Sequence, residues 1–463
     1  MIRIEKIKNT FKVSNDRLTN KYGNPLYTKG LVDIINGCDE DTLFHMSFDC
    51  IHKYLGVYLT DMAVKNDIHI GSEFGTKGVD IDQLLNLQHT HRDVWFETCY
   101  ANLLSISKPK LGVLLDMFKF IVHDYAEGGL FLNLGLNPYE ELKRINPNLN
   151  VKIAHSGFQV TKYKNNTISI PMYALCAHSK IEDYLQGLNS GLKTAFQPYR
   201  PNKLGLFTNR KPRAPRLKML GYLDKFGLLS DMDWTCNINY NREKNEWYNQ
   251  PIDSNTLENA DYKDNDIFAG ATLDKDDPFY TDVENFKLKY QNQFPKELPH
   301  LEFTKENIMT SGWTINKDFI GKYKFNVVVE TLITDHYKPP HVFYSEGFVS
   351  DKTFKAMLYN APILGVKDIA SNQYLKKIGF HTLSLPISVR DNNANRFYNL
   401  DKSLDGLNEN EQIYEIVDFM ASDTKNLDTV FKFIAEENYN KMCDQNFLAG
   451  LVINPLKEAL TRQ

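Results

Sequence analysis

Residues 322–366 read KYKFNVVVETLITDHYKPPHVFYSEGFVSDKTFKAMLYNAPILGV, and the order of apolar runs and polar turns in them indicates the fold class. The run from Phe325 to Val329 is short, apolar and β-branched, which is typical of a strand covered on both faces of a sheet. Glu330 follows at once, so we expect it at the carboxyl end of that strand, where α/β sheets open into ligand crevices. A polar loop, a helix starting after Ser350 and a second apolar strand follow. The stretch therefore predicts half of a nucleotide-binding α/β domain.

The start of the predicted helix carries one anion and one cation. Ser350 is a suitable N-cap, and Asp351 and Lys352 follow it in the first turn. A carboxylate at this place can accept hydrogen bonds from ribose hydroxyls, and an ammonium beside it can pair with phosphate. The alternative interpretation is that the two residues only cap the helix.

A second segment, residues 203–227, reads KLGLFTNRKPRAPRLKMLGYLDKFG and predicts a strand, a basic turn and a helix. The basic residues between the strand and the helix are Arg210, Lys211, Arg213 and Arg216. Free backbone N–H groups and the positive end of the dipole converge at a helix start, so this turn predicts an anion site. Arginine adds a planar fork suited to a pyrophosphate. Taken alone, a basic cluster is more often a solvated surface.

The two segments together resemble the donor-binding half of the α1,3-fucosyltransferase family, whose motif runs YKFN-x-x-x-E-N and then Y-[VI]-T-E-K. Residues 323–330 and 348–352 carry the resemblance, and Arg216 aligns with an arginine that opens a helix in that family. The chain departs from the pattern at Thr331 in place of Asn, at Asp351 in place of Glu, and in a longer loop. The resemblance and the basic turn together predict these donor-binding residues: Arg210, Arg213, Arg216, Glu330, Asp351 and Lys352.

The same segments are also similar to glycosyltransferase-like proteins of tailed phages and other large DNA viruses. Residues 209–216 match an N-R-x-P-R-x-x-R segment, and residues 350–355 are close to S-E-K-T-F-K. These resemblances imply an α/β fold of the GT-B type, with two Rossmann-like domains facing each other across a cleft. They also imply an inverting, metal-independent transfer from a nucleotide-sugar donor, which would be a partner of the protein.

The chain of 463 residues is longer than one hydrophobic core normally sustains, so we expect two domains. Two prolines between residues 197 and 202 indicate a linker. We expect an acceptor-binding Rossmann-like domain with helical additions at 1–198 and a nucleotide-sugar-binding Rossmann-like domain at 199–440. By the GT-B resemblance, a last helix at 441–463 returns toward the first domain.

The catalytic base should come from the N-terminal half. Residues 118–122 predict a strand, and a polar turn with a glycine pair follows it. An inverting transfer needs one group that takes the proton of the acceptor hydroxyl. Glu127 is our first choice and Asp124 the second, and the alternative is that each is a turn carboxylate.

A helix at 138–145 and a strand at 151–154 continue the pattern of a parallel sheet.

Composition is ordinary for a water-soluble protein, with 42% hydrophobic and 24% charged residues and a net charge of −4. The sequence has neither an apolar stretch that could cross a bilayer nor the apolar core of a signal peptide, so we expect a cytoplasmic protein, in the host if it is viral. The pairs Asp80/Asp82 and Asp231/Asp233 match the D-x-D pattern of metal-dependent transferases of another fold, but such pairs arise by chance among 58 acidic residues. We expect no metal and no cofactor beyond the nucleotide-sugar.

The acceptor is open between three interpretations. A hydroxymethylated pyrimidine in double-stranded DNA is favoured by the viral resemblance, although the net charge of −4 is against it. A soluble or lipid-linked glycan is the alternative. A protein that binds the nucleotide-sugar without turnover is the third interpretation.

Overall fold

The structure is a computed structural model of the whole chain, and it divides into two compact units. The first unit consists of Met1–Asp183, Lys338–Val349 and Asp444–Gln463, and the second of Tyr184–Tyr337 and Ser350–Cys443. The residues that the structure describes are 30, 33–34, 42–45, 120–124, 138–155, 165–171, 174, 198–209, 213–236, 238–241, 246–249, 273–294, 296, 298, 319–330, 349–366, 369–383, 387–391, 394–398, 404 and 407–461.

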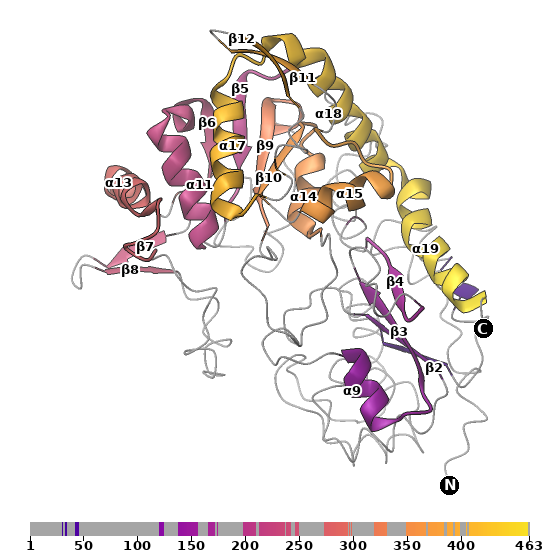
Figure 1. The fold of residues 1–463 in the computed structure, drawn as a ribbon. Helices are drawn as coiled ribbons and strands as arrows, with labels where there is room; N and C mark the ends of the chain where they lie inside the picture. Colours follow the sequence, from indigo (N-terminus) through magenta and orange to yellow (C-terminus); the bar gives the residue numbers. More distant parts are fainter. Residues whose placement is uncertain are drawn as a thin grey trace, which may run out of the picture. The chain divides into compact units, whose positions relative to one another are not determined.

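The first unit contains a parallel sheet with the strand order β1-β2-β3-β4. Its strands are β1 (Thr42–His45), β2 (Phe120–Asp124), β3 (Asn150–His155) and β4 (Thr167–Ser169). Helix α9 (Pro138–Ile145) connects β2 to β3 and is followed by Leu149, which is fully buried with Leu142 of the helix. This confirms the helix predicted at 138–145 and the parallel sheet around it (Figure 1).

The last helix, α19 (Gln445–Thr461), belongs to the first unit and contacts β4. Asp444 caps its start, since its Oδ1 accepts hydrogen bonds from the backbone N–H groups of Asn446 (2.9 Å) and Phe447 (3.1 Å). Such a cap supplies acceptors for helix N–H groups that have none within the helix. The chain thus returns to the first unit at a defined helix start.

The second unit is built on another parallel sheet, with the strand order β10-β9-β5-β6. The strands are β5 (Lys203–Phe207), β6 (Met232–Trp234), β9 (Tyr323–Val329) and β10 (Ile363–Val366). Two antiparallel hairpins accompany this sheet: β7 (Ile238–Asn241) with β8 (Glu246–Asn249), and β11 (Ile387–Asp391) with β12 (Ala394–Tyr398). The mixed α/β class with parallel sheets is therefore as predicted.

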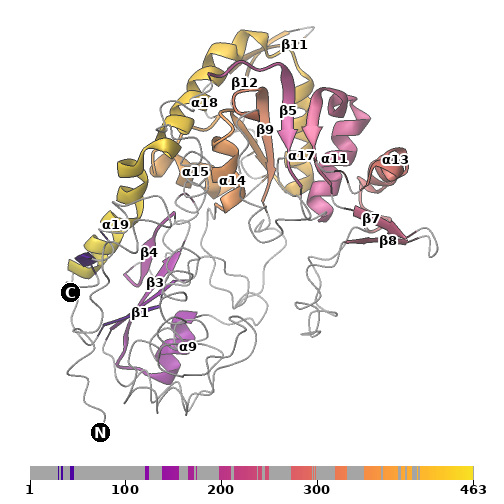
Figure 2. The same cartoon turned by 180° about the vertical axis from the view of Figure 1, so that it is seen from behind.

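Helices surround this sheet, as Figure 2 shows from behind. The longer ones are α11 (Ala214–Lys225), α13 (Tyr280–Tyr290), α14 (Asp351–Met357), α15 (Ile369–Lys377), α17 (Glu409–Ala421) and α18 (Asp428–Cys443). Short 3₁₀ turns complete the unit: η4 (Leu228–Asp231), η6 (Gln291–Gln293) and η10 (Lys425–Leu427). The C-terminal part of the second unit is helical in α17 and α18, and α19 (Gln445–Thr461) lies within the last helix predicted at 441–463.

Strand β9 is covered on both faces, as its continuous apolar run predicts. On one face the ring of Phe325 packs against the rings of Phe419 from α17 and Phe431 from α18, with distances between ring centroids of 5.8 Å and 5.0 Å. On the other face the Nδ2 of Asn326 donates to the backbone oxygen of Ala356 in α14, at 2.7 Å. Successive side chains of a strand point to opposite faces, so neighbouring residues serve different layers of the core.

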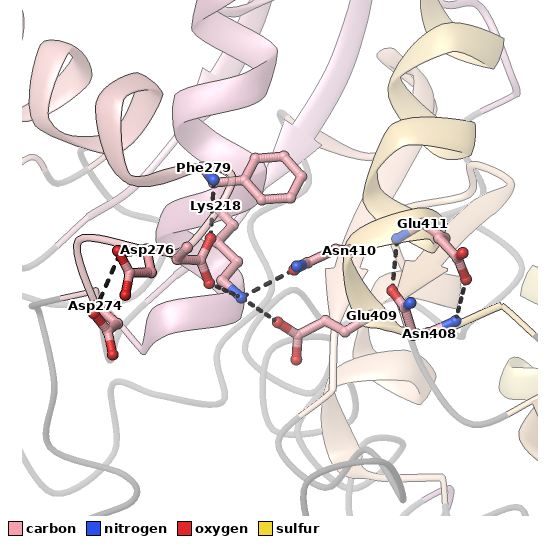
Figure 3. A network of polar contacts seen from close by, with 9 residues as sticks. Lys218, Asp274, Asp276, Phe279, Asn408, Glu409, Asn410 and Glu411 are labelled. Atoms are coloured by element: carbon pink, nitrogen blue, oxygen red, sulfur yellow. Dashed lines mark hydrogen bonds and ion pairs between the residues drawn. The ribbon is translucent and has the colours of Figure 1, made fainter.

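A polar junction joins α11 to α17 and to the turn before α13 (Figure 3). The Nζ of Lys218 lies 2.7 Å from Oδ2 of Asp277, 3.2 Å from Oε1 of Glu409 and 2.9 Å from Oδ1 of Asn410. The side chains of Lys218 and Glu409 are only 8% and 4% exposed. A buried ammonium with two carboxylates and an amide is a fully paired group, and it fixes where α17 begins relative to α11.

Candidate functional site

The carboxyl ends of β5 and β9 lie side by side in the sheet of the second unit. From β5 the chain moves through α11 to β6 on one side, and it later returns to β9 on the other side. The two strands are parallel, with Gly205 opposite Phe325 and Leu206 opposite Asn326. Their ends therefore form a topological switch point, the place where open α/β sheets bind ligands.

Arg216 spans this switch point. It lies in the first turn of α11, is only 4% exposed, and its Nε donates to the backbone oxygen of Val329 at 3.3 Å. Val329 is the last residue of β9, so one arginine connects the helix that follows β5 to the end of the neighbouring strand. The structure thus brings together the two sequence segments on which the donor-site prediction depends.

The start of α11 is positively polarised. Arg213 is the N-cap, and among the described residues no side chain caps this helix start. The first turn, which the structure describes completely, contains Pro215 and Arg216 and no acidic residue. Pro215 has no N–H, and the N–H groups of Arg216 and Leu217 both donate to the oxygen of Arg213 at 3.0 Å, so the helix dipole and the arginines, rather than a row of unpaired N–H groups, favour a bound anion here. Two further predicted residues, Arg210 and Lys211, lie outside the described residues.

Glu330 directly follows β9 and is 2% exposed. Its carboxylate accepts hydrogen bonds from the backbone N–H of Ser350 (3.3 Å), from the Ser350 hydroxyl and from the Thr353 hydroxyl (2.6 Å). All three donors belong to the N-cap and first turn of α14. A carboxylate at this place satisfies the helix start and opposes its positive dipole, so α11 rather than α14 remains the stronger anion site.

The helix start predicted after Ser350 is confirmed. The Ser350 hydroxyl accepts a hydrogen bond from the backbone N–H of Lys352 at 3.2 Å, which makes it the N-cap of α14. Lys352 is half-buried in the first turn, whereas the side chain of Asp351 lies outside the described residues. The backbone geometry therefore presents both residues at the edge of the sheet that carries Glu330.

Comparison with known proteins gives no match to a family model, to a curated protein or to a solved structure. The chemistry of this site is therefore argued from its own residues.

Asn209 and Thr235 lie at the carboxyl ends of β5 and β6, and the sequence patterns did not point to either residue. The backbone N–H of Asn209, two residues beyond β5, donates to the Oγ1 of Thr235 at 2.7 Å, and Thr235 directly follows β6. Both residues are buried. Among the described residues, no group forms a hydrogen bond with the Nδ2 or the Oδ1 of Asn209. The sequence signal was present in the polar pair Thr208-Asn209 after an apolar strand.

The two candidates for the catalytic base belong to the first unit. Asp124 is the last residue of β2, so it stands at the carboxyl end of a parallel strand. The strand predicted at 118–122 ends two residues later than expected. Glu127 lies outside the described residues.

Metal ligands are not clustered in the part of the chain that the structure describes, where no group of three or more His, Cys, Asp or Glu side chains could hold an ion. Of the D-x-D pairs, Asp80 and Asp82 lie outside the described residues, while Asp233 forms a salt bridge with Lys203 and accepts from the Tyr323 hydroxyl at 2.8 Å. Within the described residues, no helix has the length and apolarity needed to cross a membrane.

Proposed function

We propose that the protein is a glycosyltransferase that takes its sugar from a nucleotide-sugar donor. The observation that carries the proposal is the switch point in the second unit, where β5 and β9 end beside each other and Arg216 reaches the oxygen of Val329. Topological switch points are the general sites at which open α/β sheets bind nucleotides. The resemblance of the same two segments to the donor-binding half of α1,3-fucosyltransferases narrows the ligand to a nucleotide-sugar.

In this proposal the pyrophosphate of the donor binds at the start of α11. The dipole of α11 attracts its oxygens, and Arg213 and Arg216, with Arg210 before them, supply positive charge. Asp351 accepts from the ribose hydroxyls and Lys352 pairs with phosphate. Glu330 acts through the helix it caps, since its carboxylate already accepts three hydrogen bonds from Ser350 and Thr353.

The proposed reaction is an inverting displacement without a metal. The acceptor hydroxyl attacks the anomeric carbon, its proton passes to a carboxylate, and the bond to the nucleoside diphosphate breaks with the electron pair on the phosphate oxygen. The arginines and the helix start stabilise the charge of the leaving group. Glu127 or Asp124 is the proposed base, within a GT-B arrangement of two Rossmann-like domains.

The proposed acceptor is a hydroxymethylated pyrimidine in double-stranded DNA. The net charge of −4 favours the second candidate, a soluble or lipid-linked glycan, because proteins that bind duplex DNA usually present a basic surface. The salt dependence of acceptor binding distinguishes the two candidates, since binding to DNA weakens steeply with added salt.

The test is a turnover assay with UDP- and GDP-sugars, in which release of the nucleoside diphosphate is measured with no acceptor, with unmodified DNA and with hydroxymethylated DNA. Release that increases only with hydroxymethylated DNA supports the first acceptor, and release that increases with free saccharides supports the second. A matched pair of variants, Arg216→Gln and Lys225→Gln, locates the donor site, since Lys225 is exposed at the far end of the same helix. Equal donor affinity in both variants would contradict the proposed pyrophosphate site.

A further inference from the structure

The side-chain amide of Asn209 is buried without a hydrogen-bond partner at the end of β5. Its residue is 0% exposed, and among the described residues neither Nδ2 nor Oδ1 forms a hydrogen bond. Burying an amide without partners is unfavourable, and most buried polar atoms of folded proteins are paired. Its backbone is nevertheless held in place, because its N–H donates to Thr235 at 2.7 Å.

The amide of Asn209 lies close in sequence to the candidate ligand site at the start of α11. Asn209 lies in the connection between β5 and α11, two residues after the strand and four residues before the N-cap Arg213. The other elements of that connection favour an anion, since the first turn of α11 contains no acidic residue. A positively polarised helix start and an unpaired buried amide therefore occur in one short connection at the carboxyl edge of the sheet.

The chemistry of the amide indicates what kind of group it binds. Nδ2 is a donor and Oδ1 is an acceptor, so phosphate oxygens could pair with Nδ2 but would leave Oδ1 unpaired. A sugar ring with neighbouring hydroxyls can serve both atoms, because each hydroxyl donates and accepts. We propose that Asn209 binds neighbouring hydroxyls of the nucleotide-sugar, beside the pyrophosphate at the start of α11. This inference rests on the proposed function and adds a residue that distinguishes a sugar from a bare anion.

The first part of the test uses stability, which needs no ligand. Asn209→Leu keeps the number and branching of the side-chain heavy atoms and removes two unpaired polar atoms, so we expect the Tm of the free protein to stay the same or to increase. Asn326→Leu is the matched control, since Asn326 is also buried (2% exposed) and its Oδ1 is likewise unpaired among the described residues, but its Nδ2 donates to Ala356 at 2.7 Å. That variant should lower the Tm by roughly 2 to 4 °C. An equal decrease in both variants would show that the amide of Asn209 is structural.

The second part measures binding of pyrophosphate, UDP, UDP-glucose, GDP and GDP-mannose by titration calorimetry. Asn209→Leu should leave the affinity for pyrophosphate unchanged and weaken that for a nucleotide-sugar by about tenfold or more. If the variant loses as much affinity for UDP or GDP as for the nucleotide-sugar, Asn209 binds hydroxyls of the ribose. If only the affinity for the nucleotide-sugar decreases, Asn209 binds hydroxyls of the transferred sugar. Both results support the inference.

Three other results overturn it, and they separate a wrong role of Asn209 from a wrong donor site. If the wild-type protein binds nucleotide-sugars and Asn209→Leu binds them equally well, or if the variant loses pyrophosphate to the same extent, the role of Asn209 is wrong while the donor site stands. If the wild-type protein binds none of the nucleotides, the proposed function fails and the inference fails with it.

Discussion

Glu330 shows how the position of one residue can follow from the sequence while its hydrogen-bond partners do not. The sequence placed it at the end of a buried strand, because an apolar run followed by a carboxylate is a local pattern. Its partners, Ser350 and Thr353, lie 20 and 23 residues further along the chain. Which donors meet the carboxylate depends on how α14 packs beside β9, and local sequence patterns contain no information on that packing.

We predict that Glu330→Ala loosens α14 more than it perturbs the rest of the second unit. The change leaves the buried Ser350 and Thr353 hydroxyls without their acceptor, and hydrogen bonds to a charged group typically contribute about 1.5–3 kcal/mol each. Hydrogen–deuterium exchange of a peptide covering 350–358 should become faster. Glu411→Ala, in the exposed capping box of α17, is the control and should affect only the start of its own helix. Unchanged exchange in α14 would refute the capping role.

We predict that the stability of the contact between residues 379–383 and α18 depends on pH through His381. Burial lowers the pKa of His381 below its ordinary value of 6.5, and Lys441 lowers the pKa further, whereas Glu437 opposes them. The Nζ of Lys441 lies 3.1 Å from Nε2 of His381 and 2.7 Å from the oxygen of Gly379. With a depressed pKa, the unfolded chain takes up the proton first as the pH falls. The contribution of His381 to the stability of the folded protein is therefore fully present above pH 6.5 and is lost as the pH falls below that value.

His381→Gln keeps an acceptor for Lys441 but does not titrate. We expect equal Tm values for the variant and the wild-type protein at pH 8 and a higher Tm for the variant at pH 5. The comparison between the two proteins removes the contribution of the carboxylates, which titrate in both. Parallel pH profiles would contradict the prediction.

At the scale of elements, the strands and helices that follow from local periodicity were predicted and their pairing was not. The helix at 138–145, the strand that became β9 and the capped start of α14 all depend on residues close in sequence. The pairing of β5 with β9 joins residues more than a hundred positions apart, such as Lys203 and Tyr323. Parallel pairing needs a crossover connection and has no local signal, so the switch point became visible only in the structure.

We predict that Lys218 holds α11, α17 and the turn before α13 together through its charge. Lys218→Met leaves the carboxylates of Asp277 and Glu409 close together without a cation, and breaking a buried ion pair typically costs about 3–5 kcal/mol. Lys225→Met on the same helix is the matched control, because Lys225 is 54% exposed and pairs with Asp282 at 3.0 Å. Exposed pairs contribute about 0–1 kcal/mol. Denaturant unfolding should separate the two variants clearly.

The triple variant Lys218→Met, Asp277→Asn, Glu409→Gln tests the cause of that loss. If uncompensated negative charge is responsible, removing both carboxylates should restore most of the stability, since buried ion pairs can often be replaced by neutral groups. If the triple variant is as unstable as Lys218→Met, the packing of the lysine stem rather than its charge holds the junction together.

For the whole molecule, the two units predict where the effects of a bound ligand should appear. The second unit carries the switch point, with Arg216 and the start of α11, so a nucleotide-sugar should protect the connections after β5 and β9 from hydrogen exchange. Ligand at a hundred times its Kd should add about 2.7 kcal/mol of stability to the unit that binds it. The donor should therefore raise the unfolding transition of that unit and leave peptides of β2 and β3 in the first unit unprotected. Protection that covers β2 and β3 but spares the start of α11 would mean that the donor binds in the first unit, and the assignment of donor and acceptor to the two halves would have to be reversed.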